Sequence, residues 1–309
     1  MTRKTILIFV GLWLATTIYI VLLPTRHYTP DAVNNLQFIE DQNEFELWHS
    51  QHLLAQWPAY WTYQLAGGTL RAWQAMSIAH ALMAGAAVGV VYLTALRLTL
   101  SQRISIGTAL VLWFSYGFWH YQSDPDIYSA GYLAVALLLL AFTYYLQGPN
   151  LRRALWLGLA GSLALLMHQL SIELGGLMGL ALIWFAWQRS VSGYAWRHVT
   201  IYAVLCALPT LVLYVIGWQG ANRYLVGIGG EPLTFLGFAL RYFGAASSGA
   251  ATWGVSLGLN TLPTAAYTFL LSWTLPPLRE ELSLWSMLPP VMLLAGLALF
   301  AVHALFVLR

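Results

Sequence analysis

The sequence predicts an all-α fold: a polytopic bundle of about nine transmembrane helices, with interfacial helices in the first long external loop. Two observations lead to this prediction. Of the 309 residues, 59% are hydrophobic and 8% are charged, whereas an ordinary soluble domain carries about 25% charged residues. The apolar residues also form runs near the length of about 20 that a helix needs to cross the hydrocarbon core. We expect residues 1–309 to form a single transmembrane domain.

The predicted spans are the apolar runs between charged positions. They cover residues 5–23, 74–96, 104–120, 128–147, 152–169, 171–188, 199–218, 252–275 and 284–308. The first run is longer than a signal-peptide core and lacks a small-x-small cleavage site, so we expect it to remain as a span. The join between the fifth and sixth runs contains neither Gly nor Pro, so these two runs could also fuse into one helix.

The charges predict the orientation. With the N-terminus in the cytoplasm, the positive-inside bias is satisfied, because these residues fall in short inner loops: Arg3, Lys4, Arg97, Arg103, Arg152, Arg153, Arg189, Arg197 and Arg279. The acids that fall outside are Asp31, Glu40, Asp41, Glu44, Glu46, Asp124, Asp126, Glu173 and Glu231. Acidic residues contribute little to insertion, so their gathering on one side invites a functional explanation. The expected location is the inner (plasma) membrane.

Two external segments are long, residues 24–73 and 219–251. The first is too aromatic to be disordered and predicts one or two helices lying along the membrane interface. In the second, Pro232 to Phe243 predicts a short helix that carries Arg241. The expected partner is the lipid bilayer. Nucleic acid is an unsuitable partner, because the fourteen Lys and Arg are scattered singly or in pairs.

Asp31 follows Tyr28-Thr29-Pro30, a few residues beyond the first predicted span. A carboxylate just above the bilayer can accept a proton from an attacking hydroxyl, which makes Asp31 a candidate general base. Asp31 also precedes a good helix start and could equally be its N-cap. Both interpretations stay open at the level of sequence.

Two histidines lie three residues apart in His49-Ser50-Gln51-His52-Leu53-Leu54 and would share one face of a helix. Such a pair can ligate a metal or bind an anion, but a zinc site also needs a third protein ligand. The alternative is a simple pair of interfacial imidazoles.

Asp124 and Asp126 lie near His120 in the short outer loop between the third and fourth spans. Two carboxylates in so small a loop suit a divalent cation, which prefers oxygen ligands. The alternative is a solvated turn in which Asp126 caps the fourth span.

Four further candidates lie on the predicted outer side. His168 and Glu173 are near the ends of the fifth and sixth spans, where ionisable residues are functional candidates by default, although His168 could be a hydrogen-bonded core imidazole. Arg223 and Arg241 suit recognition of phosphate. Their alternative role is to extend toward lipid headgroups.

The order of these features resembles the GT-C superfamily of membrane glycosyltransferases, which includes protein O-mannosyltransferases, aminoarabinose transferases and oligosaccharyltransferase catalytic subunits. In that family a first span leads into a long external loop with an early catalytic Asp, and a second acidic motif follows in the next external loop. The segments that carry the resemblance here are Tyr28-Thr29-Pro30-Asp31, His49 to Leu54, which is similar to the "HHLL" segment of some bacterial members, and Ser123-Asp124-Pro125-Asp126-Ile127-Tyr128. It covers roughly the first 190 residues.

The resemblance implies a GT-C-like fold and inverting transfer of a sugar from a polyprenyl-phosphate donor to a glycan, lipid or protein acceptor on the extracytoplasmic face. It implies Asp31 as general base, and Asp124 and Asp126 as residues that bind Mg or Mn or orient the acceptor. The substrate-binding residues would be His49, His52, His168, Glu173, Arg223 and Arg241, with the two arginines holding the phosphate.

Two other classes of protein fit the same composition. A transporter would need ionisable residues near the bilayer midplane, often beside broken helices. A non-catalytic subunit of a larger complex would use the aromatic outer loop as an interface. Substitution of Asp31 separates an enzyme from a scaffold.

Overall fold

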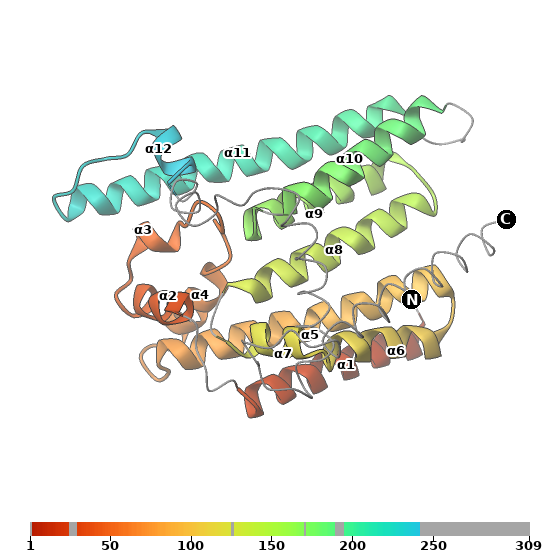
Figure 1. Ribbon diagram of the computed structural model, residues 1–309, viewed down its shortest axis with the longest axis horizontal. Helices are drawn as coiled ribbons and strands as arrows, with labels where there is room; N and C mark the ends of the chain where they lie inside the picture. The colour runs from red at the N-terminus through yellow and green to blue at the C-terminus, as the bar shows by residue number, and fades with distance from the viewer. Residues whose placement is uncertain (1, 25–29, 125–126, 170, 189–194, 242–309) are drawn as a thin grey trace, which may run out of the picture. The chain divides into compact units, whose positions relative to one another are not determined.

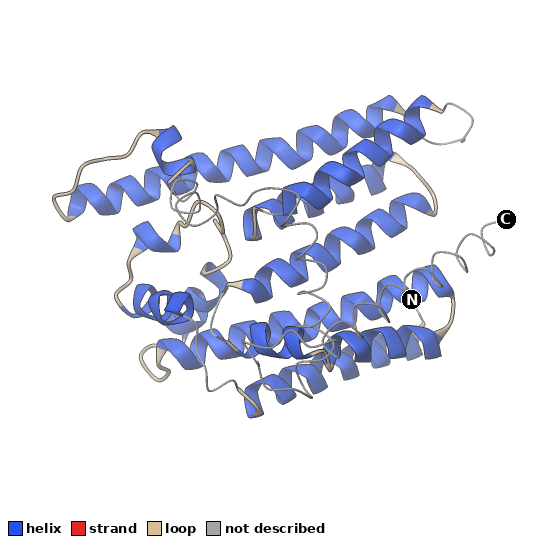
Figure 2. Ribbon diagram, in the orientation of Figure 1, coloured by secondary structure: helices blue, strands red, loops and turns tan. Residues whose placement is uncertain are grey.

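A computed structural model describes residues 2–24, 30–124, 127–169, 171–188 and 195–241. These residues form helices joined by turns, and Figure 2 shows no strand among them. The predicted all-α fold is therefore confirmed for the described residues. The two predicted spans at 252–275 and 284–308 lie outside the described residues, and so does Asp126.

The helices are α1 Arg3–Leu22, α2 Pro30–Glu40, α3 Glu44–Leu47, α4 Trp57–Leu65, α5 Ala72–Thr99, α6 Gln102–Trp113, α7 Tyr116–Ser123, α8 Tyr128–Leu146, α9 Leu151–Met167, α10 Ser171–Trp187, α11 Trp196–Gly227 and α12 Phe235–Ala239. Among the described residues, four helices are long and apolar enough to cross a membrane, namely α1, α5, α8 and α11, and α10 is a shorter apolar helix. The chain thus has several helices of the kind that a membrane protein requires.

The described residues of 1–113 and 121–241 belong to one compact unit, and residues 114–120 are separate from it. In the larger unit, α5 packs against α1, α6 and α8, while α9 packs against α8 and α11 (Figure 1). Gly85 and Gly89 of α5 make close contact with α1 possible. A Cβ atom at Gly85 would collide with the Trp13 carbonyl, and one at Gly89 would lie 2.6 Å from the Phe9 ring. Small residues four apart are a common means of close helix packing in membranes.

Two predicted spans differ from the observed helices. The run at 104–120 is not one helix, because α6 ends at Trp113 and α7 begins at Tyr116, directly after Ser115, a residue type favoured at N-caps. The run at 199–218 continues as helix to Gly227, with Pro209 inside it. The second segment predicted to be external therefore begins later than residue 219, and its short helix covers Phe235–Ala239 within the described residues.

The join between the fifth and sixth predicted spans does break the helix. After α9, His168 has extended backbone (φ −159°, ψ 119°). The backbone N–H of Gln169 donates to the carbonyl of Gln51 at 2.9 Å instead of continuing the helical ladder. A tertiary hydrogen bond thus separates α9 from α10 where the sequence offers neither Gly nor Pro.

The segment 24–73, which was predicted to be external, contains α2, α3 and α4, so its predicted helical content is confirmed. Figure 1 shows these three helices at the same end of the larger unit as α12. They pack on the start of α5 through a cluster of buried apolar side chains that includes Ile39, Leu47, Ala59 and Met76. This packing fixes the segment that carries most of the site described next.

Candidate functional site

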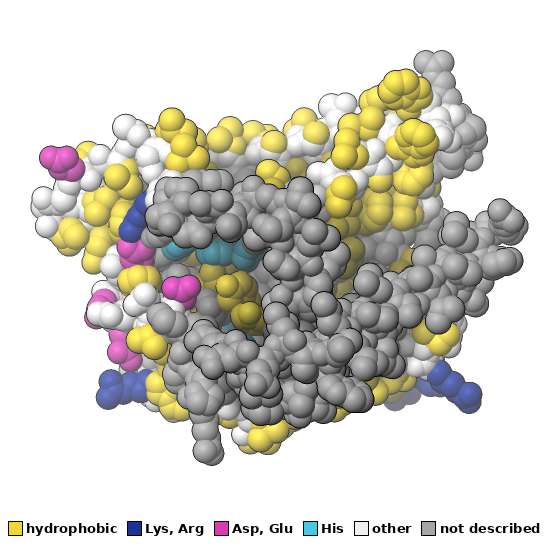
Figure 3. All heavy atoms as spheres, viewed as in Figure 1, with side chains coloured by type: hydrophobic (Ala, Val, Ile, Leu, Met, Phe, Trp, Pro, Cys, Tyr) yellow, Lys and Arg dark blue, Asp and Glu magenta, His cyan; other side chains and the backbone are white. Residues whose placement is uncertain are grey.

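A cavity of about 470 Å³ lies among α2, α3, the turns that follow α3, the start of α8 and Arg241 after α12. We call it the polar cavity. Its lining residues are Asp31, Asn34, Asn35, Phe38, Glu46, His49, Gln51, His52, Gln56, Ile127, Tyr128 and Arg241. Figure 3 shows acidic side chains, in magenta, gathered at the left of the view. Histidine side chains, in cyan, lie to the right of them.

One face of α2 forms a wall of the polar cavity. Asp31, Asn34, Asn35 and Phe38 follow one another at helical spacing and all line it. Asp31 lies inside the first turn of α2, so the N-cap interpretation is wrong. A negative charge in the first turn is favourable for the helix. The asparagines were not predicted as site residues, although their spacing from Asp31 in the sequence already placed them on its face.

The turn segment, residues 48–56, forms the opposite wall. His49 and His52 do not lie on a helix as predicted; instead the N–H of His52 donates to the carbonyl of His49 across a turn, at 3.0 Å. The segment is held by partners far along the chain. The N–H of Leu54 donates to the carbonyl of Leu166 at 3.0 Å. The Tyr214 hydroxyl donates to the carbonyl of Ser50.

Packing fixes the turn segment as firmly as hydrogen bonding does. The Trp48 indole lies against α11 where that helix has two glycines three residues apart. A Cβ atom at Gly217 would lie 2.8 Å from Leu53, and one at Gly220 would lie 2.5 Å from Nε1 of Trp48. Leu53, Leu166, Ala221 and Phe238 complete this buried cluster. The cavity wall is therefore built on the membrane-length helix α11 and on the end of α9.

Three imidazoles follow one another along this wall. The rings of His49 and His52 stack with centroids 5.1 Å apart, and His52 meets His168 edge-on at 4.4 Å. Burial lowers the pKa of His49 to about 4, with Arg241 adding to the decrease and Glu46 opposing it. Burial lowers the pKa of His52 further, assisted by His168 and His49. Both rings are therefore neutral at neutral pH and present one acceptor and one donor nitrogen each.

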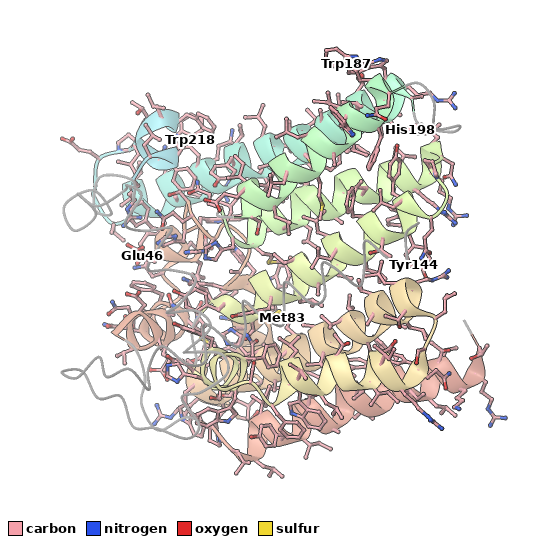
Figure 4. The ribbon with its side chains drawn as sticks, turned by 45° about the vertical axis from the view of Figure 1, so that its right-hand side comes forward. Glu46, Met83, Tyr144, Trp187, His198 and Trp218 are labelled. Atoms are coloured by element: carbon pink, nitrogen blue, oxygen red, sulfur yellow. The ribbon has the colours of Figure 1, made fainter. Side chains whose placement is uncertain are left out.

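Arg241 joins the segment after α12 to the segment around α3. Its guanidinium pairs with Glu46 at 2.5 Å and lies over the Phe45 ring, 3.6 Å from the centroid. Figure 4 labels Glu46 at the same end of the unit as Trp218 of α11. Arg241 is thus held at the cavity edge by a carboxylate and an aromatic face, an arrangement that a guanidinium accommodates well.

A second cavity of about 370 Å³ shares the lining residue Tyr128 with the first. We call it the apolar cavity. It lies between α8, the end of α9 and the start of α10, and is lined by Tyr128, Gly131, Tyr132, Val135, His168, Ser171 and Leu174. His168 lies in this cavity while its ring contacts His52, which lines the polar cavity.

The structure brings together only part of the predicted site. Asp31, His49, His52 and Arg241 share the polar cavity, and His168 lines the apolar one. Asp124 is 1% exposed and lines neither of these two cavities. Glu173 and Arg223 are exposed on α10 and α11 and likewise line neither.

A metal centre does not fit the part of the chain that the structure describes. Within residues 2–241, leaving out the undescribed gaps, no group of three or more His, Cys, Asp or Glu side chains is arranged to hold a metal ion. The predicted partner of Asp124, Asp126, lies outside that part. We therefore derive no chemical step through a divalent cation.

A comparison of the chain with models of known protein families and with curated proteins found no match. The functional argument therefore depends on the two cavities and on the residues that line them. Sequence reasoning missed Glu46, Gln51, Gln56 and Tyr128 as lining residues. Of these, Gln51 lies between His49 and His52 in the sequence, so its place beside two candidate residues could have indicated it.

Proposed function

We propose that the protein is a GT-C-type membrane glycosyltransferase that moves a sugar from a polyprenyl-phosphate donor to an acceptor hydroxyl, with Asp31 as general base. One observation carries the proposal. Tyr128 lines both a polar cavity that contains a carboxylate and an apolar cavity, so the two cavities suit the polar and the apolar part of one lipid-linked sugar. This combination suits a donor whose tail stays in the bilayer.

The sizes and linings support this class of substrate. A polar cavity of about 470 Å³ falls within the roughly 300–1,000 Å³ of ordinary small-molecule sites. Its amides and neutral imidazoles suit sugar hydroxyls, which both donate and accept hydrogen bonds. The apolar cavity, which is lined mainly by residues of the apolar helices α8 and α10, suits the first units of a lipid chain.

The proposed chemistry is a single displacement with inversion. The Asp31 carboxylate takes the proton of the acceptor hydroxyl, and the acceptor oxygen bonds to the anomeric carbon. The bond from that carbon to the phosphate oxygen breaks, and its electron pair leaves with the polyprenyl phosphate. A positioned base of this kind contributes roughly 10²- to 10⁴-fold to a rate.

Arg241 is the proposed phosphate-binding residue. It is the described cation that lines the polar cavity, and its guanidinium is already fixed by Glu46 and Phe45. Charge that develops on the leaving phosphate is stabilised best by donors that need not reorganise. Arg223, which is exposed and outside both cavities, keeps only a role in steering anions toward the surface.

The proposed topology has about nine spans, with the N-terminus in the cytoplasm of the cell and the protein in the plasma membrane. The positive-inside bias supports it, because Arg3, Arg97, Arg103 and Arg153 all lie in α1 or next to short loops on one predicted side. The polar cavity would then open on the extracytoplasmic face, with α2, α3 and α4 along the interface.

Glycan analysis of whole cells tests the proposal. A strain that lacks the gene is complemented with the native chain, with Asp31→Asn or with Glu40→Gln, and its cell-envelope glycans are measured by mass spectrometry. We expect a sugar modification that is lost in the deletion strain, stays absent with Asp31→Asn, and returns with Glu40→Gln, an exposed acid on the same helix outside the cavity. Full restoration by an expressed Asp31→Asn variant would instead indicate a non-catalytic subunit.

A further inference from the structure

The side chain of Gln56 is a fixed part of the polar cavity. It is 1% exposed yet lines the cavity, and its Nε2 donates to Oδ1 of Asn35 at 2.8 Å. Because the amide group is planar, this hydrogen bond also sets the direction of the carbonyl oxygen. The Asn35–Gln56 pair therefore holds one acceptor in a defined orientation.

That acceptor lacks a partner within the described residues. Oε1 of Gln56 is buried and has no hydrogen-bond partner among them. Buried polar atoms are nearly always paired, because a group that has lost water and gained nothing destabilises the protein. A cavity-lining acceptor in this state is suited to a donor on a bound molecule.

A second acceptor lines the same cavity. The ring of His52 also lines the cavity, and its Nδ1 is buried without a hydrogen-bond partner among the described residues. In the neutral imidazole that carries its proton on Nε2, Nδ1 is an acceptor. The cavity thus presents two uncharged acceptors from residues 52 and 56.

Because both atoms are uncharged hydrogen-bond acceptors, the group that binds beside them must carry hydrogen-bond donors. An ionised phosphate offers only acceptor oxygens and finds no donor in Gln56 Oε1 or His52 Nδ1. Arg241, the described cation that lines the cavity, lies beside Glu46, with which it forms an ion pair. A group that carries hydroxyl donors and no charge matches the two acceptors, and a phosphate matches Arg241.

We propose that Gln56 Oε1 and His52 Nδ1 accept hydrogen bonds from two hydroxyl groups of a neutral sugar ring, so that the Asn35–Gln56 pair determines which sugars bind. The sugar then lies against the turn segment, and the phosphate lies at Arg241. The choice of a sugar among hydroxyl-rich ligands rests on the proposed function. The acceptor pair itself rests only on the geometry.

Binding of short-tailed glycosides tests the inference without turnover. The protein is placed in lipid nanodiscs, and affinities are measured for octyl glucoside, octyl galactoside and octyl mannoside against tetraethylene glycol monooctyl ether. All four probes carry the same tail, but the ether head has a single hydroxyl. We expect at least one glycoside to bind about tenfold more tightly than the ether, as for one or two added hydrogen bonds. Equal affinities would overturn the inference.

Gln56→Met removes the acceptor and keeps the length of the side chain. We expect this variant to lose the glycoside preference, while Gln64→Met, an exposed position of α4 outside the cavity, keeps it. His52→Phe keeps an aromatic ring against His168 and should reduce the preference as well. Asn35→Leu leaves Gln56 in place but releases its orientation, and supplies the test if Gln56→Met does not fold. An unchanged preference in a Gln56→Met protein with native unfolding temperature contradicts the inference.

The binding measurement separates this inference from the transferase proposal. A preference that depends on Gln56 in a protein with no transfer activity supports the sugar site and contradicts the proposed reaction. Transfer that requires Asp31, together with glycoside binding that ignores Gln56, supports the reaction and overturns the sugar site.

Discussion

The contact between α1 and α5 and the contact between the turn segment and α11 are built differently. In the first, two regular helices lie against each other, and the Trp13 indole donates to the carbonyl of Leu82 at 2.9 Å. In the second, backbone groups of an irregular segment form hydrogen bonds with residues more than 100 positions away, among them Leu166 and Tyr214. The first contact holds a membrane-length helix in place. The second shapes a cavity.

The difference teaches where rigidity is needed. Helices α1 and α5 satisfy their own backbones, so their contact requires only matching shapes. The turn segment satisfies only part of its backbone internally, so some of its N–H and C=O groups pair with distant residues, and these hydrogen bonds hold the segment in place. A segment held in this way is what a binding site requires. Substitutions at glycines in both contacts therefore compare a structural contact with a functional one.

The largest effect is expected at the α1–α5 contact. In Gly85→Leu the new side chain would meet the Trp13 carbonyl and, at 2.5 Å from the Cβ position, the Thr17 hydroxyl. Because backbone cannot move aside, we expect a loss of about 3 kcal/mol or more in unfolding free energy. Gly11→Leu on α1 is the control, since no atom lies within 4 Å of its Cβ position. Equal unfolding temperatures for the two variants would contradict the packing described here.

A smaller effect on stability, but a specific one on the site, is expected at Gly220. A Cβ atom there would lie 2.5 Å from Nε1 of the Trp48 indole, so we expect the indole to move and His49, the next residue in the chain, to move with it. We expect Gly220→Leu to cost about 1–3 kcal/mol and to weaken glycoside binding in nanodiscs. Gly227→Leu, at the end of the same helix with no atom within 4 Å, should change neither quantity. Native glycoside affinity in folded Gly220→Leu would show that Trp48 does not support the cavity.

The smallest effect is a dependence of stability on pH. The pKa of His49 is about 4 in the folded protein, below its ordinary value of 6.5, because of burial. The unfolded chain therefore binds more protons between pH 6.5 and pH 4, and stability falls as pH decreases through that window. We expect the unfolding temperature to fall less steeply with decreasing pH in His49→Gln than in the native chain. Parallel curves would mean that His49 does not make this contribution.

The sequence predicted the regular parts of the molecule well. Long apolar runs indicated α1, α5, α8 and α11, because a helix that satisfies its own backbone leaves a continuous signal in the chain. The break after Met167 could not be predicted, since it depends on a hydrogen bond from Gln169 to Gln51. The same bond ties the turn segment to the start of α10, a contact that the local sequence of neither segment reveals.

The site was predicted only in part, because a single sequence shows the chemistry of a residue but not its tertiary contacts. Asp31, His49, His52 and Arg241 were chosen for their chemistry and share the polar cavity. Gln56 was not chosen, because an isolated glutamine is common and only its burial beside Asn35 makes it notable. Asp124 was chosen as a carboxylate in a short loop suited to a divalent cation, and it is buried and lines neither cavity. Burial depends on contacts between distant segments, which a single sequence does not reveal.

The central claim is that one lipid-linked molecule occupies both cavities and passes Tyr128. Photo-crosslinking in nanodiscs tests it with a polyprenyl phosphate that carries a diazirine in its first isoprene unit, followed by mapping of the labelled peptides. We predict label concentrated on the residues of α8 and α10 that line the apolar cavity, such as Val135 and Leu174. Label spread evenly over α1, α6 and the other apolar helices, with no excess at that cavity, would contradict the account.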